Sequence, residues 1–312
     1  MPDNQTKTAL QRGGLQPTLK NIIYNIFIYF SIIFLCVALY RADYLKIPEI
    51  HSLTFLLLSI PFLFAGFIGN AYAWQKSLEQ AGFKVGFKES FNSIGLSMFG
   101  KYIPGKIWMV MGRSGYLATK KNYSISQLSI ISLNAQIITL WVGLMIGFIG
   151  LCFLEGFGLY GWFMVFLGMI LSALIFSPFF HSLISSLIRL VLRDEINLPR
   201  LTNRSVILIL PSYFAYWILW SVGFYFLSIS LLQTDVSWLS GFGFPLASTI
   251  GIMAIFSPGG LGVREVIITG YLTLSGISLS ESTTVAVTAR LWFLLGEISV
   301  FIAAWVLRLR DG

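Results

Sequence analysis

The sequence predicts an all-α, polytopic integral membrane protein. Hydrophobic residues make up 56% of the 312 residues and charged residues only 11%, whereas soluble globular domains carry roughly 25% charged residues. The mean hydropathy is +0.79. Several apolar runs reach about twenty residues, which is the length that an α-helix needs to cross the hydrocarbon core. These observations exclude a soluble domain and predict a bundle of about eight transmembrane helices.

The expected spans follow these apolar runs in chain order. A polar tail over residues 1–20 comes first, and no small-residue cleavage site follows the first run, so we expect that run to be a retained helix. We expect a single transmembrane domain over 21–308, with two halves at about 21–192 and 205–308 as a further division. The expected spans are 22–40, 53–73, 127–154, 161–178, 205–232, 238–257 and 284–307.

Most basic residues gather in one set of connecting segments, which gives the expected orientation. Because loops rich in Lys and Arg stay inside, both termini are expected in the cytoplasm and the protein in the cytoplasmic (inner) membrane. The net charge of +8 is then explained by topology and lipid contacts, and nucleic acid is not an expected partner. The basic segments are 1–21, 76–121, 189–204 and 308–310, and the segments without basic residues are 155–160, 233–237 and 276–283.

This orientation requires one further crossing between about residues 257 and 284, where only a short apolar segment, 262–276, is available. A short helix entered through a Pro-Gly break would give eight crossings. A re-entrant hairpin is the competing interpretation. Hydropathy alone does not choose between them.

The segment 254–275 contains a break and two charges at membrane depth. Backbone that Pro and Gly open inside a membrane must line protein or a water-filled cavity, and charges there indicate a functional site. Free N–H groups beside an arginine suit a phosphate group. The alternative is a pair at the membrane edge that caps a helix. The candidate substrate-binding residues of this segment are Pro258, Gly259, Gly260, Arg264 and Glu265.

A second broken segment lies at 89–118, where Lys101, Pro104, Gly105, Lys106 and Arg113 interrupt apolar sequence. YIPG and the following GYL in this segment have nearly the same spacing as FSPG and GYL in the other. Corresponding broken segments in two halves indicate a transporter's binding site. Either an internal duplication or chance explains the match, and on the expected topology the two halves run parallel.

Three basic residues of the first broken segment, Lys101, Lys106 and Arg113, stand beside the aromatic residues Tyr102 and Trp108. Together they are expected to form a funnel that attracts anionic lipid headgroups. Interfacial anchoring is the simpler explanation for each residue taken alone.

The last expected span carries Arg290 and Glu297, which are seven residues apart and share one helix face. Glu297 is expected near the bilayer midplane, where a charge must be paired, protonated or in contact with water. One interpretation is a structural pair with Arg290 or with Asn134 and Gln136. The other is function: Arg290 binds substrate or meets the carboxylate of the second broken segment, and Glu297 carries a proton.

Three short segments carry a family resemblance: PGGLGVRE at 258–265, KYIPGKIW at 101–108 and RLW at 290–292. They resemble signature segments of the lysylphosphatidylglycerol synthase transmembrane family, also called the flippase-like domain family, and the resemblance runs from about 20 to 308. The best-known members of this family are the multiple peptide resistance factors. The resemblance implies that their membrane domain moves aminoacylated phospholipid across the bilayer. The sequence ends at Gly312, so we expect a stand-alone membrane domain without the synthase part.

The sequence therefore predicts a flippase-like transporter of a phospholipid or a polyprenyl-phosphate-linked sugar, with the headgroup at Arg264, Lys106 and the Pro-Gly backbone. Glu265 and Glu297 are the expected proton-coupling residues. A membrane-embedded transferase and an accessory subunit acting on a lipid-linked sugar are the alternatives. We expect no enzyme activity, cofactor or metal, since neither a P-loop nor a DxD-like cluster is present. A second copy or an enzyme of envelope biosynthesis is the expected protein partner.

The orientation predicts cytoplasmic termini at both ends of the chain. Reporter domains that are active only outside the cytoplasm should give no signal when fused to either terminus. A strong signal at the C-terminus would contradict the orientation, and on the eight-span topology it would mean that 262–276 does not cross.

Overall fold

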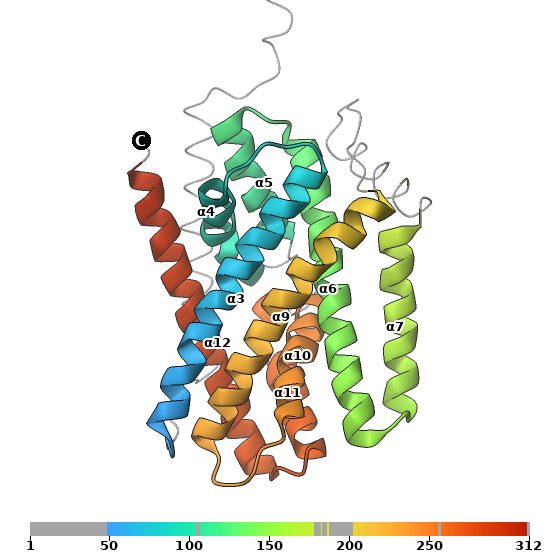
Figure 1. Ribbon diagram of the computed structural model, residues 1–312, viewed down its shortest axis with the longest axis vertical. Coiled ribbons are helices and arrows are strands. Elements are labelled where there is room, and N and C mark those ends of the chain that lie inside the picture. The colour runs from blue at the N-terminus through green and yellow to red at the C-terminus, as the bar shows by residue number, and fades with distance from the viewer. Residues whose placement is uncertain are drawn as a thin grey trace, which may run out of the picture.

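The computed structural model describes residues 49–103, 107–177, 202–254 and 257–310, together with 182 and 186 (Figure 1). This part of the chain is helical and contains no strand. The all-α fold class is therefore confirmed. The first expected span, 22–40, lies outside the described residues.

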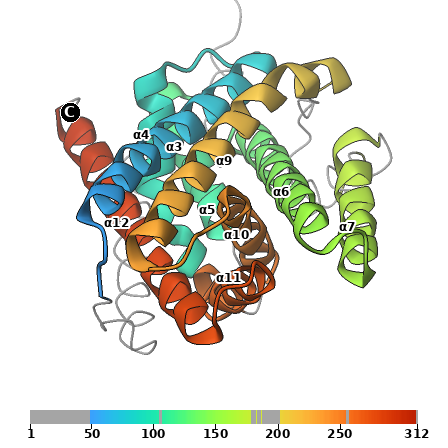
Figure 2. The ribbon, with the colours of Figure 1, turned by 60° about the horizontal axis from the view of Figure 1, so that its bottom comes forward.

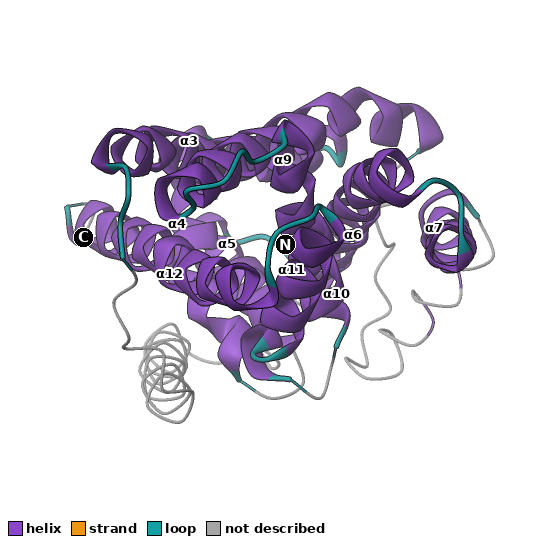
Figure 3. Ribbon diagram, turned by 90° about the horizontal axis from the view of Figure 1, so that it is seen from below, coloured by secondary structure: helices purple, strands orange, loops and turns teal. Residues whose placement is uncertain are grey.

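Among the described residues, four helices are long and apolar enough to cross a membrane. They coincide with four of the expected spans, and most of their ends lie within a few residues of the expected ones. The exception is α3, which extends seven residues further than expected. The shorter apolar helix α7, Leu159–Phe176, follows α6 and lies at the edge of the bundle (Figure 3). The four long helices are α3 (Leu53–Gln80), α6 (Ile125–Glu155), α9 (Asn203–Leu231) and α12 (Leu279–Leu309).

The first broken segment folds as a helical hairpin, named here the first hairpin. It comprises α4 (Phe87–Ser97), the 3₁₀-helix η1 (Met98–Tyr102) and α5 (Ile107–Lys121). The limbs are antiparallel, because Lys121 pairs with Glu89 at 2.6 Å near the open end and Asn92 donates to the Tyr116 hydroxyl at 3.3 Å. At the open end, partial burial opposes ionisation of Glu89, but hydrogen bonds from Lys121 and from the Gly86 N–H lower its pKa overall.

The second broken segment forms the second hairpin, which comprises η2 (Trp238–Phe242), α10 (Gly243–Met253), η3 (Pro258–Gly260) and α11 (Val263–Leu274). The Tyr271 hydroxyl near the end of α11 donates to the Leu239 carbonyl at 3.0 Å, and the side chain of Arg264 at the start of α11 lies against Gly251 near the end of α10. The two limbs are therefore antiparallel as well.

The lengths of these limbs bear on the alternative that hydropathy left open. The twelve residues of α11 span roughly 18 Å at 1.5 Å per residue, well short of the roughly 30 Å hydrocarbon core. This favours one re-entrant hairpin over two separate crossings by 238–257 and 262–276. A hairpin also leaves the C-terminus on the same side, so a reporter there does not distinguish the two topologies. The count of about eight spans remains a prediction.

The two hairpins enter the bundle from opposite ends (Figures 1 and 2). Helices α3 and α9 are antiparallel, because the Ser52 N–H donates to the Ser230 carbonyl at 3.1 Å while Ser77 and Tyr213 share a hydrogen bond at the other end. The first hairpin follows the end of α3 and the second follows the end of α9. The two broken segments are thus inverted, which corrects the expectation of parallel halves. That expectation aligned 238–257 with the span of α3, whereas the structure aligns α9 with α3.

Small residues let each hairpin pack closely against a long helix. A Cβ atom at Gly95 of α4 would lie 2.6 Å from the Ala304 Cβ of α12, and one at Gly147 of α6 would lie 2.5 Å from the Leu246 Cβ of α10. Real Cβ atoms do not approach so closely, so a larger side chain at either glycine would push a hairpin away from its support.

The hairpin topology predicts that its tip is out of reach of both aqueous faces. With Cys36 and Cys152 replaced by Ser, a Leu261→Cys variant in intact membranes should resist impermeant maleimides added to either side. The exposed positions Lys84 and Ser280, changed to Cys, should each react from one face only, and from opposite faces. Labelling of Leu261→Cys from the cytoplasmic face at the rate of Lys84→Cys would instead support two crossings.

Candidate functional site

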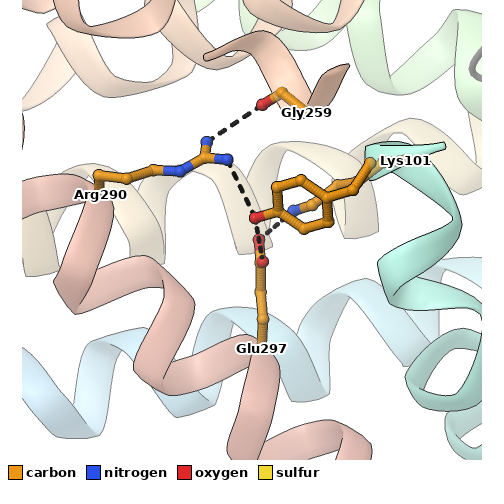
Figure 4. Close-up of polar contacts among 5 residues, drawn as sticks. Lys101, Gly259, Arg290 and Glu297 are labelled. Atoms are coloured by element: carbon orange, nitrogen blue, oxygen red, sulfur yellow. Dashed lines mark hydrogen bonds and ion pairs between the residues drawn. The ribbon is translucent and has the colours of Figure 1, made fainter. Parts of the chain in front are cut away.

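The tips of the two hairpins meet through Arg290 of α12. One nitrogen of its guanidinium group donates to the Gly259 carbonyl of the second hairpin at 3.1 Å, and another donates to the Tyr102 hydroxyl of the first at 3.0 Å (Figure 4). A single buried side chain, 3% exposed, therefore contacts both tips.

Glu297 lies about two turns after Arg290 on the same face of α12 and is 1% exposed. Its Oε1 atom forms an ion pair with Lys101, and its Oε2 atom accepts a hydrogen bond from the Tyr102 hydroxyl at 3.0 Å (Figure 4). The Tyr102 hydroxyl thus joins Arg290 to Glu297. The described part of the chain contains no hydrogen bond from Glu297 to the alternative partners Asn134 and Gln136.

Aromatic rings surround the cations of this site. The Lys101 ammonium lies 5.4 Å from the centroid of Phe293, and the Arg264 guanidinium carbon lies 5.1 Å from the same centroid and 5.2 Å from that of Phe244. Ring faces attract cations, and the attraction grows away from water. Sequence reasoning missed both phenylalanines. The sequence does contain a signal for Phe293, because this residue lies three positions after Arg290 and four before Glu297, on the same helix face.

Arg264 and Glu265 follow the Pro-Gly break and are incompletely satisfied. Arg264 is 6% exposed, and the described part of the chain offers its guanidinium neither a hydrogen bond nor an ion pair. Glu265 is partly buried, and its Oε2 atom is fully buried without a hydrogen-bond partner among the described residues. Buried charges usually have hydrogen-bond or ion-pair partners, and these two groups have none among the described residues.

Glycine shapes the tip of the second hairpin. Pro258 begins η3, and Gly259, Gly260 and Gly262 have φ angles of 60°, 73° and 79°, a left-handed region that favours glycine. A Cβ atom at Gly260 would also lie 2.9 Å from the backbone carbonyl oxygen of Gly251. The tip therefore brings backbone close to the charged side chains, as the PGG sequence predicts.

Arg113, the other described basic residue of the expected funnel, does not join this cluster. Arg113 of α5 is 7% exposed, binds the hydroxyl and carbonyl oxygens of Ser132 on α6, and lies 4.7 Å from the ring centroid of Trp74 on α3. Among the described residues it shares no partner with Lys101, and the funnel stays a prediction. Lys106 lies outside the described residues, as do Pro104 and Gly105.

The family model for the lysylphosphatidylglycerol synthase TM region matches residues 22–295 of this chain. The chain belongs to this family. The resemblance carried by PGGLGVRE, KYIPGKIW and RLW is thereby confirmed, and the protein is a multi-pass membrane protein of a lipid-related family. No curated protein matches the chain. In this family member, the three resembling segments supply Arg264, Lys101 and Arg290, which the fold gathers around Phe293 and Tyr102.

The ion pair predicts unequal effects of removing its two partners. Glu297→Ala would leave the cations Lys101, Arg264 and Arg290 together, so we expect it to lower the free energy of unfolding by about 3–5 kcal/mol. Lys101→Met should cost less, because it removes a cation from a cationic cluster. A Lys101→Met/Glu297→Met double variant should be more stable than Glu297→Ala.

Denaturant unfolding of the purified variants in mixed micelles measures these differences. Glu297→Gln is the matched control, since it keeps an acceptor for Tyr102 while removing the charge. The changes in unfolding free energy of the single variants Lys101→Met and Glu297→Met are then added and compared with that of the double variant. Agreement within about 0.5 kcal/mol would show that the two side chains are not coupled.

Proposed function

We propose that this protein moves an anionic lipid, either a phospholipid or a polyprenyl-phosphate-linked sugar, between the leaflets of the bilayer. The observation that carries the proposal is the meeting of two inverted hairpins at a buried cluster with an excess of positive charge. Three cations, Lys101, Arg264 and Arg290, face one fully buried carboxylate, Glu297. Membership of a lipid-related family supports the same substrate class.

The depth of this cluster supports a role in passage across the membrane. Arg290 and Glu297 flank Leu294, the midpoint of the 31-residue helix α12. At 1.5 Å per residue, the cluster lies roughly 20 Å from either end of the helix. A charged headgroup meets its greatest barrier at this depth, because hydrocarbon cannot replace its hydration shell. Fixed cations and backbone N–H groups supply that replacement.

The inverted hairpins suggest how access alternates between the two leaflets. Inverted repeats in transporters rock about a central site, so that one side opens as the other closes. In the described conformation the hairpin tips are joined through Tyr102, Arg290 and Gly259, which corresponds to a closed passage. A lipid phosphate that binds these cations competes with Glu297 and with the tip contacts, and thereby favours separation of the hairpins.

The direction of transport would be set by a gradient or by consumption of the lipid after it crosses. Glu265 is the proposed proton carrier, because its buried Oε2 atom has no hydrogen-bond partner in the described part of the chain. Glu297 is the second candidate, and its ion pair with Lys101 would open on protonation.

Reconstitution separates this proposal from a transferase. Liposomes containing the purified protein should exchange a labelled phospholipid or polyprenyl-phosphate sugar between leaflets faster than empty liposomes. A parallel reaction with labelled sugar donors should give no new lipid product. Product formation without leaflet exchange would contradict the proposal and favour the transferase.

The role of Glu265 gives a sharper prediction. Glu265→Gln keeps the size and hydrogen-bonding capacity of the side chain but removes its titration, so we expect normal insertion and thermal stability with severely reduced lipid exchange. Glu155→Gln, at an exposed position, is the control and should exchange lipid like the parent. Parental exchange by Glu265→Gln, together with mere destabilisation by Glu265→Ala, would make the residue a helix cap.

A further inference from the structure

Arg264 is a buried cation whose donors lack acceptors in the described part of the chain. Its guanidinium group carries five N–H donors. The rings of Phe244 and Phe293 lie 5.2 and 5.1 Å from its central carbon, and a ring face attracts the charge without supplying an oxygen acceptor. Close contact of its side-chain stem with Gly251 holds it in this place. The charge is therefore fixed and available to an anion.

The start of α11 supplies further donors beside it. Gly262 precedes α11 and has no side chain to cap the helix. The first backbone hydrogen bond of the helix is donated by the Val266 N–H to the Gly262 carbonyl at 3.0 Å. The N–H groups of residues 263–265 precede that bond and have no acceptor within the described residues. They lie at the positive end of a twelve-residue helix, where anions bind favourably.

Charge balance indicates which anion fits. Among the described charged side chains of this site, Lys101, Arg264 and Arg290 are cations and Glu265 and Glu297 are carboxylates, which leaves one positive charge. A phosphodiester carries one negative charge and would make the group neutral. A phosphomonoester that has lost both protons would leave an excess negative charge next to Glu265, at a depth where unbalanced charge is costly.

We propose that Arg264 and the first turn of α11 form a binding site for the phosphodiester group of a lipid. The arginine fork donates to two phosphate oxygens, and the N–H groups of α11 donate to the same group. The site then recognises the phosphodiester group itself and not the headgroup alcohol that is esterified to it. This inference rests on the proposed transport function and names the part of the cargo that the site binds.

Binding to the purified full chain in neutral detergent tests the site. The probes are dihexanoyl phosphatidylglycerol as the phosphodiester, dihexanoyl phosphatidic acid as the monoester, dihexanoylglycerol without phosphate, and inorganic phosphate. Calorimetric titration at pH 8.5 should show the phosphodiester binding at least tenfold more tightly than each of the other three. Equal affinity for inorganic phosphate would overturn the assignment to a lipid.

Variants connect this binding to the named residues. Arg264→Gln should weaken phosphodiester binding tenfold or more, Arg264→Lys should weaken it less, and Arg204→Gln, at an exposed position, should bind like the parent. Glu265→Gln should raise the affinity for the monoester relative to the diester. The unfolding temperature of each variant is measured alongside. Parental affinity in a stable Arg264→Gln or Arg264→Lys variant would overturn the inference.

The outcomes separate this inference from the transport proposal. If Arg264→Gln binds the phosphodiester normally while the parent exchanges lipid in liposomes, the binding site is wrong and the transport function stands. If binding requires Arg264 but the parent exchanges no lipid, the site stands and transport is wrong.

Discussion

The buried ion pair between Lys101 and Glu297 is the interaction on which the site depends. A carboxylate near the middle of a long apolar helix is costly without a partner, and the tip of the first hairpin brings that partner to it. Tyr102 and Arg290 extend the pair to the second hairpin through hydrogen bonds of 3.0 Å. The position of both tips is thus linked to the charge state of one acidic side chain.

The inverted arrangement gives this link a functional meaning. Each hairpin packs closely against a long helix at a glycine. Gly95 of α4 lies against α12, and Gly147 of α6 lies against α10 of the second hairpin. The tips, by contrast, meet through polar contacts that an anionic ligand can exchange. Close apolar packing along the limbs and exchangeable polar contacts at the tips are the combination that lets two rigid hairpins separate at their ends.

Much of this architecture follows from sequence, and the remainder has identifiable physical reasons. Apolar length predicts the long helices, and Pro and Gly predict the two breaks. Hydropathy counts apolar residues but does not give direction, so it does not choose between a crossing and a re-entrant hairpin at 262–276, and it leads to the expectation of parallel halves. The partner of Glu297 lies 196 residues away along the chain, and no local pattern encodes that contact. Phe293 is different, because helical periodicity places it beside Arg290 and could have identified it.

The most direct test of the account is the distance between the tips of the two hairpins with and without anionic lipid. Spin labels at Ile107→Cys on α5 and Val266→Cys on α11, two exposed positions next to the tips, report this distance by double electron–electron resonance in nanodiscs, in a chain without Cys36 and Cys152. The account predicts one short distance in neutral lipid and a second, longer population when a phosphodiester lipid of net negative charge is added. A single unchanged distance under both conditions, in a protein that exchanges this lipid, would contradict it.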